Sequence, residues 1–421
     1  MKRIAMFAMM ALLAFGDAFA AVSVRMDSDA ALLMEDGTQL VSAGAYADIV
    51  PLGSDLFAAS SDGERFALMD AEGALLTDSM YDEFRVEGDL LLAQRGGEWG
   101  LMNEDGTELG AFAYRRIAAD GEGGFWALRE DALVLLDADG SARESGLRAL
   151  RIGEASEGLL SVQTQAGRWG CCDRSGRLVI PTDYDYIGNF VSGRAAAVSD
   201  GRYGAIDRSG GWIVEPIYDF LEISESGFIL AADRDGALLL DLEGGEIAAY
   251  LEENIYAALA GDGYVIENGE SLRIFDASGA LLEELAPDAS VTEGIGEQLI
   301  ISEGMWGETC VRLLGTEAAY QNLYPLGMAE GEPVYACMEV NAARYANDLL
   351  HEIQIAVDMD TACYGLVNGA GEQILPCGYI SIEYLANDRF LVRAERQWQL
   401  IDSEGKIYWR RRVTQTEAPN S

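Results

Sequence analysis

Short apolar runs of four to six residues alternate with polar turns along most of the chain. Runs of this length between glycine and aspartate turns are typical of β-strands, and the best-preserved segments lack helix-length amphipathic stretches. A clear turn has Asp or Asn at its first position and Gly three residues later, as in Asp173 and Gly176. The aspartate accepts hydrogen bonds from the turn amides, and the glycine supplies a positive φ. This turn therefore predicts a hairpin between 169–172 and 177–180.

These hairpins belong to a sequence repeat of about 35 residues. Its core is an aromatic residue and Gly, two apolar residues, Asp or Asn, two variable residues and Gly. Successive closing glycines from Gly37 to Gly279 are separated by 33 to 36 residues. Helical repeats of similar length fit poorly, because a turn breaks every unit. The residues that define the four clearest copies are Trp99, Gly100 and Gly106; Trp169, Gly170, Asp173 and Gly176; Tyr203, Gly204, Asp207 and Gly210; and Tyr364, Gly365, Asn368 and Gly371.

The recurring aromatic-Gly pair has a structural interpretation. One aromatic residue at the same position of every unit is expected to pack between stacked units, in preference to forming a ladder that stacks on a ligand. The glycine after it is expected to let a neighbouring strand or ring approach closely. These residues are therefore predicted to define the repeat rather than to carry chemistry.

Each unit has room for about four short strands, like a compact propeller blade. A Tyr-Asp signal such as Tyr184-Asp185 follows the hairpin and precedes another short strand. Pro181, Pro216 and Pro376 are predicted to end the second hairpin strand, because proline cannot donate to a β-ladder. The predicted fold is all-β, a β-propeller-like tandem of four-strand repeats, with an open β-solenoid as the alternative. Eleven units exceed the four to eight blades of typical propellers, so two rings, one large ring and a solenoid stay open.

The repeat resembles a known family, the WG or KWG repeat, which is a β-rich bacterial repeat named for its aromatic-Gly pair. The resemblance covers most of 25–409, although Phe66-Ala67 and Trp398-Gln399 lack the glycine. It implies a propeller-like or solenoid-like interaction surface without a known catalytic apparatus, and it names no ligand. The best match rests on Arg168-Trp169-Gly170, Asp173-x-x-Gly176, Val179-Ile180-Pro181, Tyr184-Asp185 and Arg202-Tyr203-Gly204.

The first twenty residues have the features of a signal peptide. Lys2 and Arg3 precede an apolar run over 4–15, and Ala18-Phe19-Ala20 forms a small-x-small cleavage site. We therefore expect a secreted or envelope-associated protein with no membrane span after cleavage. The predicted divisions are the signal peptide at 1–20, WG-type β-repeats at 21–315, a degenerate repeat with an insertion at 316–362, further repeats at 363–409 and a flexible tail at 410–421.

Composition and charge exclude two classes of protein. Of 421 residues, 49% are hydrophobic, which is enough for a large core and excludes global disorder. The chain has 29 basic and 71 acidic residues and a formal net charge of −42. Such a surface repels phosphate backbones, so nucleic acid is excluded as a partner.

The six cysteines permit fifteen pairings in an exported chain. If Asn368 pairs with Glu372 across the turn, the hairpin register sets Cys363 opposite Cys377, which predicts a disulfide between them. Cys310 and Cys337 are the next plausible pair, whereas Cys171 and Cys172 are expected to be core residues. The chain has no CxxC or cysteine-histidine spacing, so no metal site is predicted.

Catalytic motifs are absent from the sequence. The only histidine is His351, and the chain has no Gly-x-Ser-x-Gly, HExxH, GxxxxGK[ST] or GxGxxG string. We therefore predict no catalytic residue and no cofactor, and we expect a protein that is not an enzyme. Paired carboxylates have no recognisable spacing in sequence, which leaves a carboxylate-dependent polysaccharide hydrolase open as an alternative.

The leading hypothesis is an exported repeat protein that acts as a binding or scaffolding module at the cell envelope. Its expected partner is an unidentified protein or a cell-surface glycan. A structural surface protein without a specific ligand is a further alternative. Because functional loops of repeat proteins project from one face, the insertion within 316–362 is the first candidate for partner contact.

Overall fold

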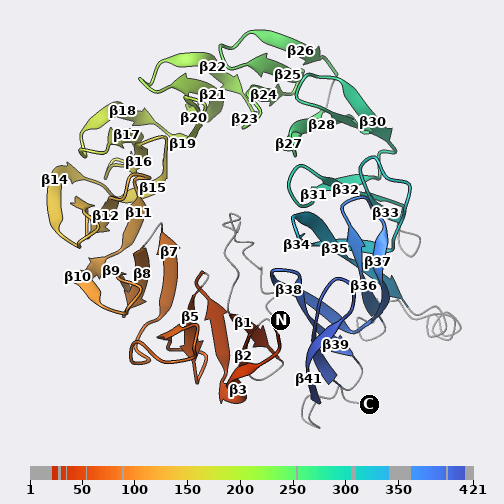
Figure 1. Cartoon of the computed structure of the whole chain (residues 1–421). Helices are drawn as coiled ribbons and strands as arrows, with labels where there is room; N and C mark the ends of the chain where they lie inside the picture. The colour runs from red at the N-terminus through yellow and green to blue at the C-terminus, as the bar shows by residue number, and fades with distance from the viewer. Residues whose placement is uncertain are drawn as a thin grey trace, which may run out of the picture.

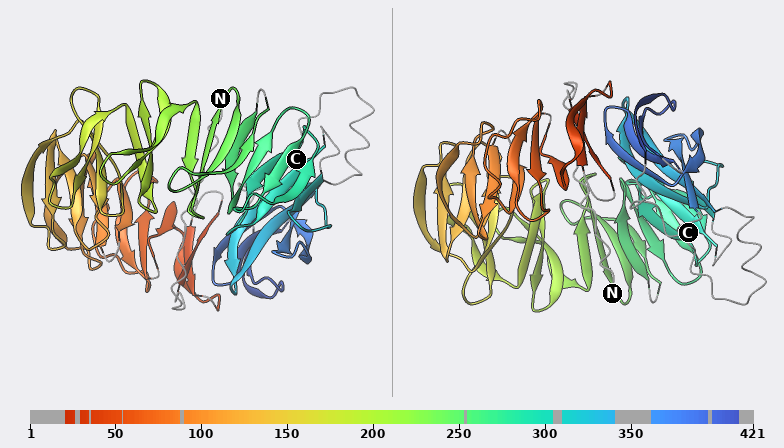
Figure 2. Two further views of the ribbon diagram at one scale, coloured as in Figure 1. Left: turned by 90° about the horizontal axis from the view of Figure 1, so that it is seen from above. Right: turned by 90° about the horizontal axis from the view of Figure 1, so that it is seen from below.

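The computed structural model describes residues 21–26, 30–34, 36–53, 55–87, 90–252, 255–304, 310–340, 362–394 and 397–412. In these residues, 41 strands form eleven antiparallel sheets, which are arranged as the blades of one ring around a central channel (Figure 1). Figure 2 shows the blades from two edges of the ring. The predicted signal peptide, His351 and residues 413–421 lie outside the described residues. Within the described part, no helix has the length and apolar character that a membrane crossing requires.

The blades are numbered here in chain order. Counted over the described residues, blades 1, 2 and 9 have three strands and the other blades have four. Blade 1 contains β1 (Ala21–Arg25), β2 (Ala30–Met34) and β3 (Gln39–Tyr46); blade 2 contains β4 (Asp48–Pro51), β5 (Leu56–Ser60) and β6 (Ala67–Asp70); blade 3 contains β7 (Glu83–Glu87), β8 (Leu90–Arg95), β9 (Glu98–Met102) and β10 (Glu108–Tyr114); blade 4 contains β11 (Arg116–Ala119), β12 (Phe125–Arg129), β13 (Ala132–Leu136) and β14 (Ala142–Arg148).

The middle of the ring follows the same order. Blade 5 contains β15 (Arg151–Ser156), β16 (Leu159–Gln163), β17 (Trp169–Asp173) and β18 (Leu178–Tyr184); blade 6 contains β19 (Tyr186–Val191), β20 (Arg194–Ser199), β21 (Arg202–Asp207) and β22 (Trp212–Tyr218); blade 7 contains β23 (Phe220–Ile223), β24 (Phe228–Asp233), β25 (Gly236–Asp241) and β26 (Glu246–Tyr250); blade 8 contains β27 (Tyr256–Ala260), β28 (Gly263–Glu267), β29 (Leu272–Phe275) and β30 (Leu281–Leu285).

The last three blades bring the chain back beside blade 1. Blade 9 contains β31 (Ser290–Glu293), β32 (Leu299–Glu303) and β33 (Cys310–Leu313); blade 10 contains β34 (Asn322–Ala329), β35 (Glu332–Val340), β36 (Ala362–Asn368) and β37 (Gln373–Tyr379); blade 11 contains β38 (Ser381–Ala386), β39 (Arg389–Ala394), β40 (Gln397–Ile401) and β41 (Ile407–Arg412). In a four-stranded blade the strands pair in sequence order, with the first facing the channel and the fourth on the outside (Figure 1).

The repeat turn closes the hairpin between the third and fourth strands of a blade. In blade 5, the Asp173 carboxylate accepts hydrogen bonds from the amides of Ser175 at 2.9 Å and Arg177 at 3.1 Å. Gly176 has a φ of +77°. These contacts hold the pKa of Asp173 below its ordinary value, with the Ser175 hydroxyl as the largest cause. The turn chemistry seen in the sequence therefore sets the third and fourth strands in place.

The fourth strand has a bulge over the glycine of the aromatic-Gly pair. In blade 5 the register of β17 and β18 shifts beside Gly170. A Cβ atom added to this glycine would lie 2.5 Å from the Ile180 carbonyl oxygen. The prediction that Pro181 ends the strand is wrong, because β18 continues to Tyr184. A bulge on an outer edge strand accommodates proline without the loss of a ladder hydrogen bond. Pro216 and Pro376 likewise lie within β22 and β37.

The Tyr-Asp signal ends one blade and begins the next. The Tyr184 hydroxyl donates to the Gly210 carbonyl oxygen at 2.5 Å, which links blade 5 to the turn of blade 6. Asp185 forms an ion pair with Arg168, the residue before the aromatic-Gly pair. The same ion pair joins Arg202 to Asp219 and Arg65 to Asp82. These contacts explain why the two signals recur together in the sequence.

The blades divide the chain differently from the predicted divisions. The boundary between 316–362 and 363–409 falls inside β36, which pairs with β35 in blade 10. The insertion connects these two strands, and its residues 341–361 lie outside the described part of the chain. The predicted tail at 410–421 begins too early, because β41 continues to Arg412 and pairs with β40. The sequence repeat and the blade therefore have different starting points.

The apolar core lies at the interfaces between blades. Trp99 of blade 3, for example, packs with Ile117 and Phe125 of blade 4. The same kind of packing closes the ring, where Leu33 of blade 1 contacts the cluster that includes Leu391 of blade 11. The propeller prediction is confirmed as one large ring, and the closure excludes the open solenoid.

Candidate functional site

A groove runs along the channel wall over the inner strands of blades 3, 4 and 5. It has a volume of about 640 Å³ and is lined by β7, β11, β15 and the turns beside them. A further hollow of about 320 Å³ shares Arg116 and Glu154 with it and extends to β19 of blade 6. We call both parts together the channel groove. Its polar and aromatic lining includes Arg85, Glu87, Trp99, Arg116, Asp120, Glu154, Glu157, Arg174, Trp169, Tyr186 and Asn189.

Charged pairs occupy the part of the groove over blades 3 to 5. The Arg85 guanidinium lies 4.6 Å from the ring centre of Trp99, and its Nε contacts Glu83 at 2.8 Å. Arg116 of β11 forms an ion pair with Glu154 of β15. Burial and the nearby Glu154 carboxylate raise the pKa of Glu87. This part of the wall therefore offers both positive and negative groups to a ligand.

The turns beside the groove are connected by further charged contacts. Arg174 forms an ion pair with Glu122 and donates to the Asp120 carbonyl oxygen at 3.1 Å. The Glu157 carboxylate contacts Arg208 at 2.9 Å and accepts a hydrogen bond from the Gly193 amide at 3.1 Å. These contacts link blades 4, 5 and 6. The lining is therefore held in place by side chains from successive blades.

An aromatic pair marks the end of the groove toward blade 6. Trp169 and Tyr186 meet edge to face with ring centres 6.0 Å apart. Tyr186 is 48% exposed and Asn189 lies beside it in the same hollow. An exposed aromatic face next to an amide suits a sugar ring or a peptide group, which combine apolar faces with hydrogen-bonding groups.

The repeat-defining residues have unequal positions relative to the groove. Trp99 and Trp169 line it with one edge while they pack between blades. Tyr203 packs at the interface of blades 6 and 7, and Tyr364 contacts Tyr324 with ring centres 6.3 Å apart. Gly100, Gly204 and Gly365 lie under the fourth strand or its side chains, as Gly170 does. Gly106, Gly210 and Gly371 have positive φ in the closing turns, where Asp207 and Asn368 accept turn amide hydrogen bonds.

Comparison with known families identifies two of these units. A family model described as the WG containing repeat matches residues 169–203 and 203–232. These two units are WG repeats. They contain Trp169, Tyr186 and Asn189, so part of the channel groove is built from WG repeats. None of the curated proteins compared with the chain matches it.

Solved structures that are similar to this chain share little sequence with it. BamB from Moraxella catarrhalis is 14% identical, with 67% of this chain and 93% of that chain covered and a TM-score of 0.34. A eukaryotic initiation factor is 10% identical, with 84% and 94% covered and a TM-score of 0.45. The C-terminal WD40 domain of Sif2 is 10% identical, with 60% and 90% covered and a TM-score of 0.32. Identities this low do not indicate a shared function.

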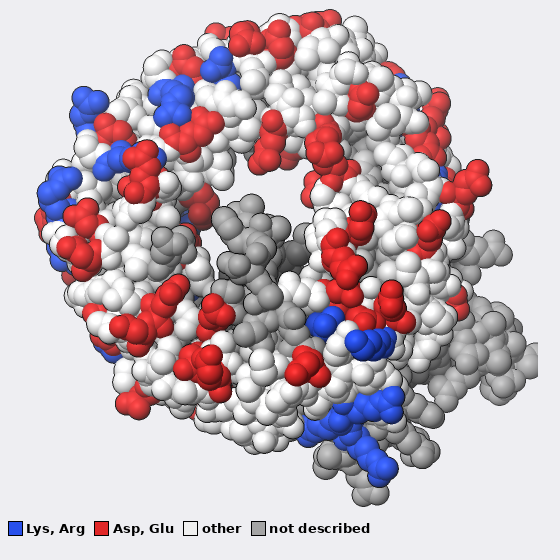
Figure 3. All heavy atoms as spheres, in the orientation of Figure 1, with Lys and Arg blue, Asp and Glu red and all other residues white. Residues whose placement is uncertain are grey.

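Charge is distributed unevenly over the ring of WG-type units. Figure 3 shows carboxylates around the ring and at the edge of the channel. Residues 213–388 contain 33 acidic and 4 basic residues. The channel groove lies outside this stretch, in blades where arginines pair with many of the carboxylates. An approaching ligand therefore meets positive side chains at the groove that most of the ring does not offer.

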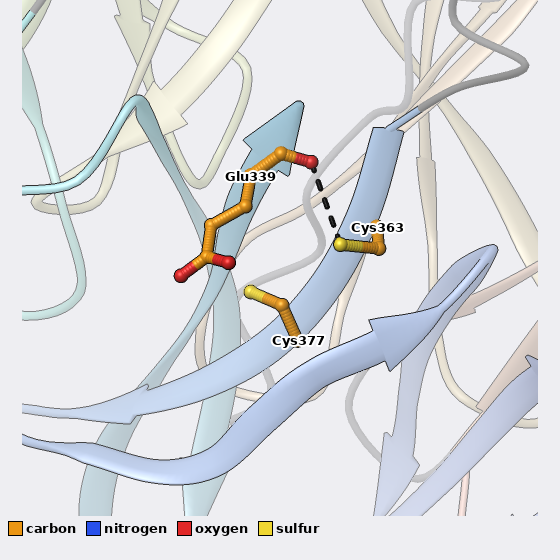
Figure 4. A group of neighbouring side chains, drawn as sticks. All are labelled: Glu339, Cys363 and Cys377. Carbon is orange, nitrogen blue, oxygen red and sulfur yellow. Dashed lines mark hydrogen bonds between the residues drawn. The ribbon is translucent and has the colours of Figure 1, made fainter. Parts of the chain in front are cut away.

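The cysteines predicted to form a disulfide lie in blade 10. The WG-type bulge pairs Tyr364 with Tyr379, so the structure does not have the register that sets Cys363 directly opposite Cys377. All six cysteines have free thiols in the structure. The Cys377 sulfur lies 3.6 Å from the sulfur of Cys337, two strands away. Figure 4 shows Cys363 and Cys377 beside Glu339, a grouping that the sequence spacing did not indicate.

Proposed function

We propose that this WG-repeat propeller is an exported binding module that holds a glycan or peptide segment of the cell envelope in the channel groove. The observation that carries the proposal is the groove itself, where arginines, carboxylates and an aromatic pair with an exposed tyrosine converge from four successive blades. Concave sites with a few convergent polar groups are where small ligands bind. A rigid ring of blades holds these groups in place before the ligand arrives, which lowers the entropic cost of binding.

The ligand class follows from the lining. The ring has a strong negative charge, which disfavours polyanions at long range. Tyr186 and Trp169 favour the apolar face of a sugar ring, and the Arg116–Glu154 pair offers donors and acceptors to its hydroxyl groups. A neutral or zwitterionic glycan therefore matches the groove better than an acidic polymer does. Binding without turnover is part of the proposal.

The test measures capture of defined glycans by the chain 21–421. The probes are soluble peptidoglycan fragments and neutral polysaccharide fragments immobilised on a surface. Arg116→Gln combined with Glu154→Gln changes two exposed groove residues with side-chain exposures of 46% and 66%. The matched control changes Arg129 and Glu144 in the same way, since this exposed pair lies outside the groove lining, with exposures of 42% and 58%.

The expected result is saturable capture that weakens at least tenfold in the groove variant and stays unchanged in the control. Probes recovered intact after binding would agree with a binding module, whereas shortened chains would favour the polysaccharide hydrolase. Equal capture by the groove and control variants would refute the channel groove as the site. Capture of neither probe class by the wild-type chain would favour a structural protein without a specific ligand.

A further inference from the structure

Four potential metal ligands lie on one face of the sheet in blade 10. Cys337 and Glu339 are two residues apart in β35, and Cys363 and Gly365 are two residues apart in β36. The strand register pairs Cys337 with Gly365 and Glu339 with Cys363. Residues two apart on a strand point to the same face, so these positions form a two-by-two patch. Cys377 of β37 joins this patch from the neighbouring outer strand.

The glycine of the aromatic-Gly pair brings the sulfurs together. Gly365 has no side chain, and the bulge of β37 crosses over it, with the Cys377 nitrogen 2.8 Å from the place where a Cβ would be. The Cys337 and Cys377 sulfurs therefore approach to 3.6 Å although their strands are not adjacent in the sheet. Gln373 Nε2 lies 3.6 Å from the Cys337 sulfur and 3.7 Å from the Cys377 sulfur.

Cys377 also belongs to a second close group of ligand atoms, with Cys363 and Glu339. The Cys363 sulfur, the Cys377 sulfur and a Glu339 carboxylate oxygen all lie within 4.8 Å of one another (Figure 4). A tetrahedral zinc ion with Zn–S bonds of about 2.3 Å holds its sulfur ligands roughly 3.8 Å apart. The 3.6 Å between the Cys337 and Cys377 sulfurs is therefore close to the distance between two ligands of one metal ion. Cys337 is buried, so the partly exposed Cys363 and the exposed Glu339 are the side chains that must rotate to complete the site.

Other blades show what these positions contain when the repeat is only structural. In blade 5 the positions of Cys337, Glu339, Cys363 and Cys377 are taken by Val162, Thr164, Arg168 and Thr182. Arg168 there forms the ion pair with Asp185 that connects neighbouring blades. Blade 10 lacks this ion pair, since Cys363 replaces the arginine and Ile380 replaces the aspartate. Three thiols and a carboxylate thus replace a structural contact of the repeat.

We propose that Cys337, Glu339, Cys363 and Cys377 bind a thiophilic divalent cation, with zinc as the ion that best matches three sulfurs and one carboxylate. Thiolates select zinc over harder cations, and zinc also accepts a carboxylate oxygen in tetrahedral coordination. Each thiol loses its proton to solvent when it binds the metal. Burial raises the pKa of the Cys337 and Cys377 thiols above its ordinary value. This site is in blade 10, apart from the channel groove in blades 3–6.

The experiment loads the reduced, metal-free chain 21–421 with Co(II) and then with Zn(II). We expect one Co(II) per chain with a near-ultraviolet charge-transfer band from cobalt-bound thiolate, and we expect Zn(II) to abolish that band. Cys363→Ser and Cys377→Ser are expected to weaken binding at least tenfold and to abolish most of the band. Glu339→Gln is expected to weaken binding while the band remains, since the sulfurs stay in place. Cys310→Ser, a change to a partly buried cysteine of blade 9, is the matched control.

Two outcomes would overturn the proposal. The first is wild-type chain with six reduced thiols that shows no thiolate band at saturating Co(II). The second is a band that survives in both Cys363→Ser and Cys377→Ser, which would place the metal elsewhere. Thermal unfolding with and without Zn(II) provides an independent readout, because a ligand that binds only the folded state raises its stability. A zinc-dependent rise in the unfolding temperature is expected for wild type and Cys310→Ser, and its absence from wild type would contradict the proposal.

Discussion

Replacement of Gly170 by alanine tests the physical reason for the glycine in the WG repeat. The added methyl group would lie 2.5 Å from the Ile180 carbonyl oxygen and 2.8 Å from that of Pro181. Favourable contact between such atoms begins near 3.5 Å, and both neighbours are backbone atoms that cannot rotate away. The bulge of β18 must therefore shift outward by about 1 Å to accommodate the methyl group. Such overpacking costs typically about 1–3 kcal/mol.

The local loss of stability can be measured from the labelling rate of two thiols on the same strand. Cys171 and Cys172 directly follow Gly170 and are 1% and 0% exposed, so a thiol reagent reaches them only when blade 5 opens. When opening equilibrates faster than labelling, a loss of 1–3 kcal/mol makes labelling roughly 5- to 150-fold faster. The assay is alkylation of the native chain, followed by mass analysis of the peptide that contains both cysteines.

Gly188 of β19 provides the matched glycine control. An alanine Cβ there would be 3.5 Å from its nearest neighbour, the Ala196 carbonyl oxygen, which is an ordinary contact. We expect Gly188→Ala to label at the wild-type rate. If Gly170→Ala folds and also labels at the wild-type rate, the close approach of β18 does not require the glycine. The physical interpretation of the aromatic-Gly pair would then be refuted.

Two other changes test contacts between blades and within the groove. Tyr184→Phe removes the hydroxyl that donates to the Gly210 carbonyl oxygen and leaves this oxygen without that partner. We expect the free energy of unfolding to fall by roughly 1–2 kcal/mol, which is measured as a lower urea midpoint. Glu87→Gln should raise the thermal midpoint at neutral pH, because burial and Glu154 raise the pKa of Glu87 and so disfavour its charged form in the fold. The protonated Glu87 carboxyl contributes to the stability of the fold below about pH 4, and this contribution is lost as the pH rises through the raised pKa. The higher thermal midpoint of the variant should therefore disappear in acid. An equal difference at both pH values would contradict this reasoning.

Local sequence signals predicted the closing turns and the presence of several short strands in each unit, although not where the fourth strand ends. The spacing of Asp173 and Gly176 defines a hairpin through interactions within five residues, and such interactions depend little on the rest of the chain. The repeat period then indicated one blade after another. The starting point of a blade was not predictable in this way, because the inner strand pairs with the strand after it while the repeat motif spans the third and fourth strands.

The candidate site depends on contacts that sequence spacing does not reveal. Arg85, Arg116 and Glu154 come from three blades and meet only because the ring places their inner strands side by side. The bulge over Gly365 is likewise a property of two strands together, so a hairpin register counted from the turn could not place Cys377 beside Cys337. One signal was available: the Arg–Asp pair that accompanies the aromatic-Gly units of blades 5 and 6 is missing from blade 10.

The glycine of the aromatic-Gly pair explains both a backbone feature that blades share and the place where their side chains differ. In blade 10 the bulged fourth strand lies over Gly365, so the residue opposite this glycine on the second strand and the residue after the proline on the fourth strand come close together. In blade 10 these residues are Cys337 and Cys377, and the matching positions of blade 5 are Val162 and Thr182. The repeat therefore fixes the course of the backbone over the glycine, while the two variable positions decide the chemistry there. A new ligand site at this place requires only side-chain changes and leaves the strand pairing of the ring intact.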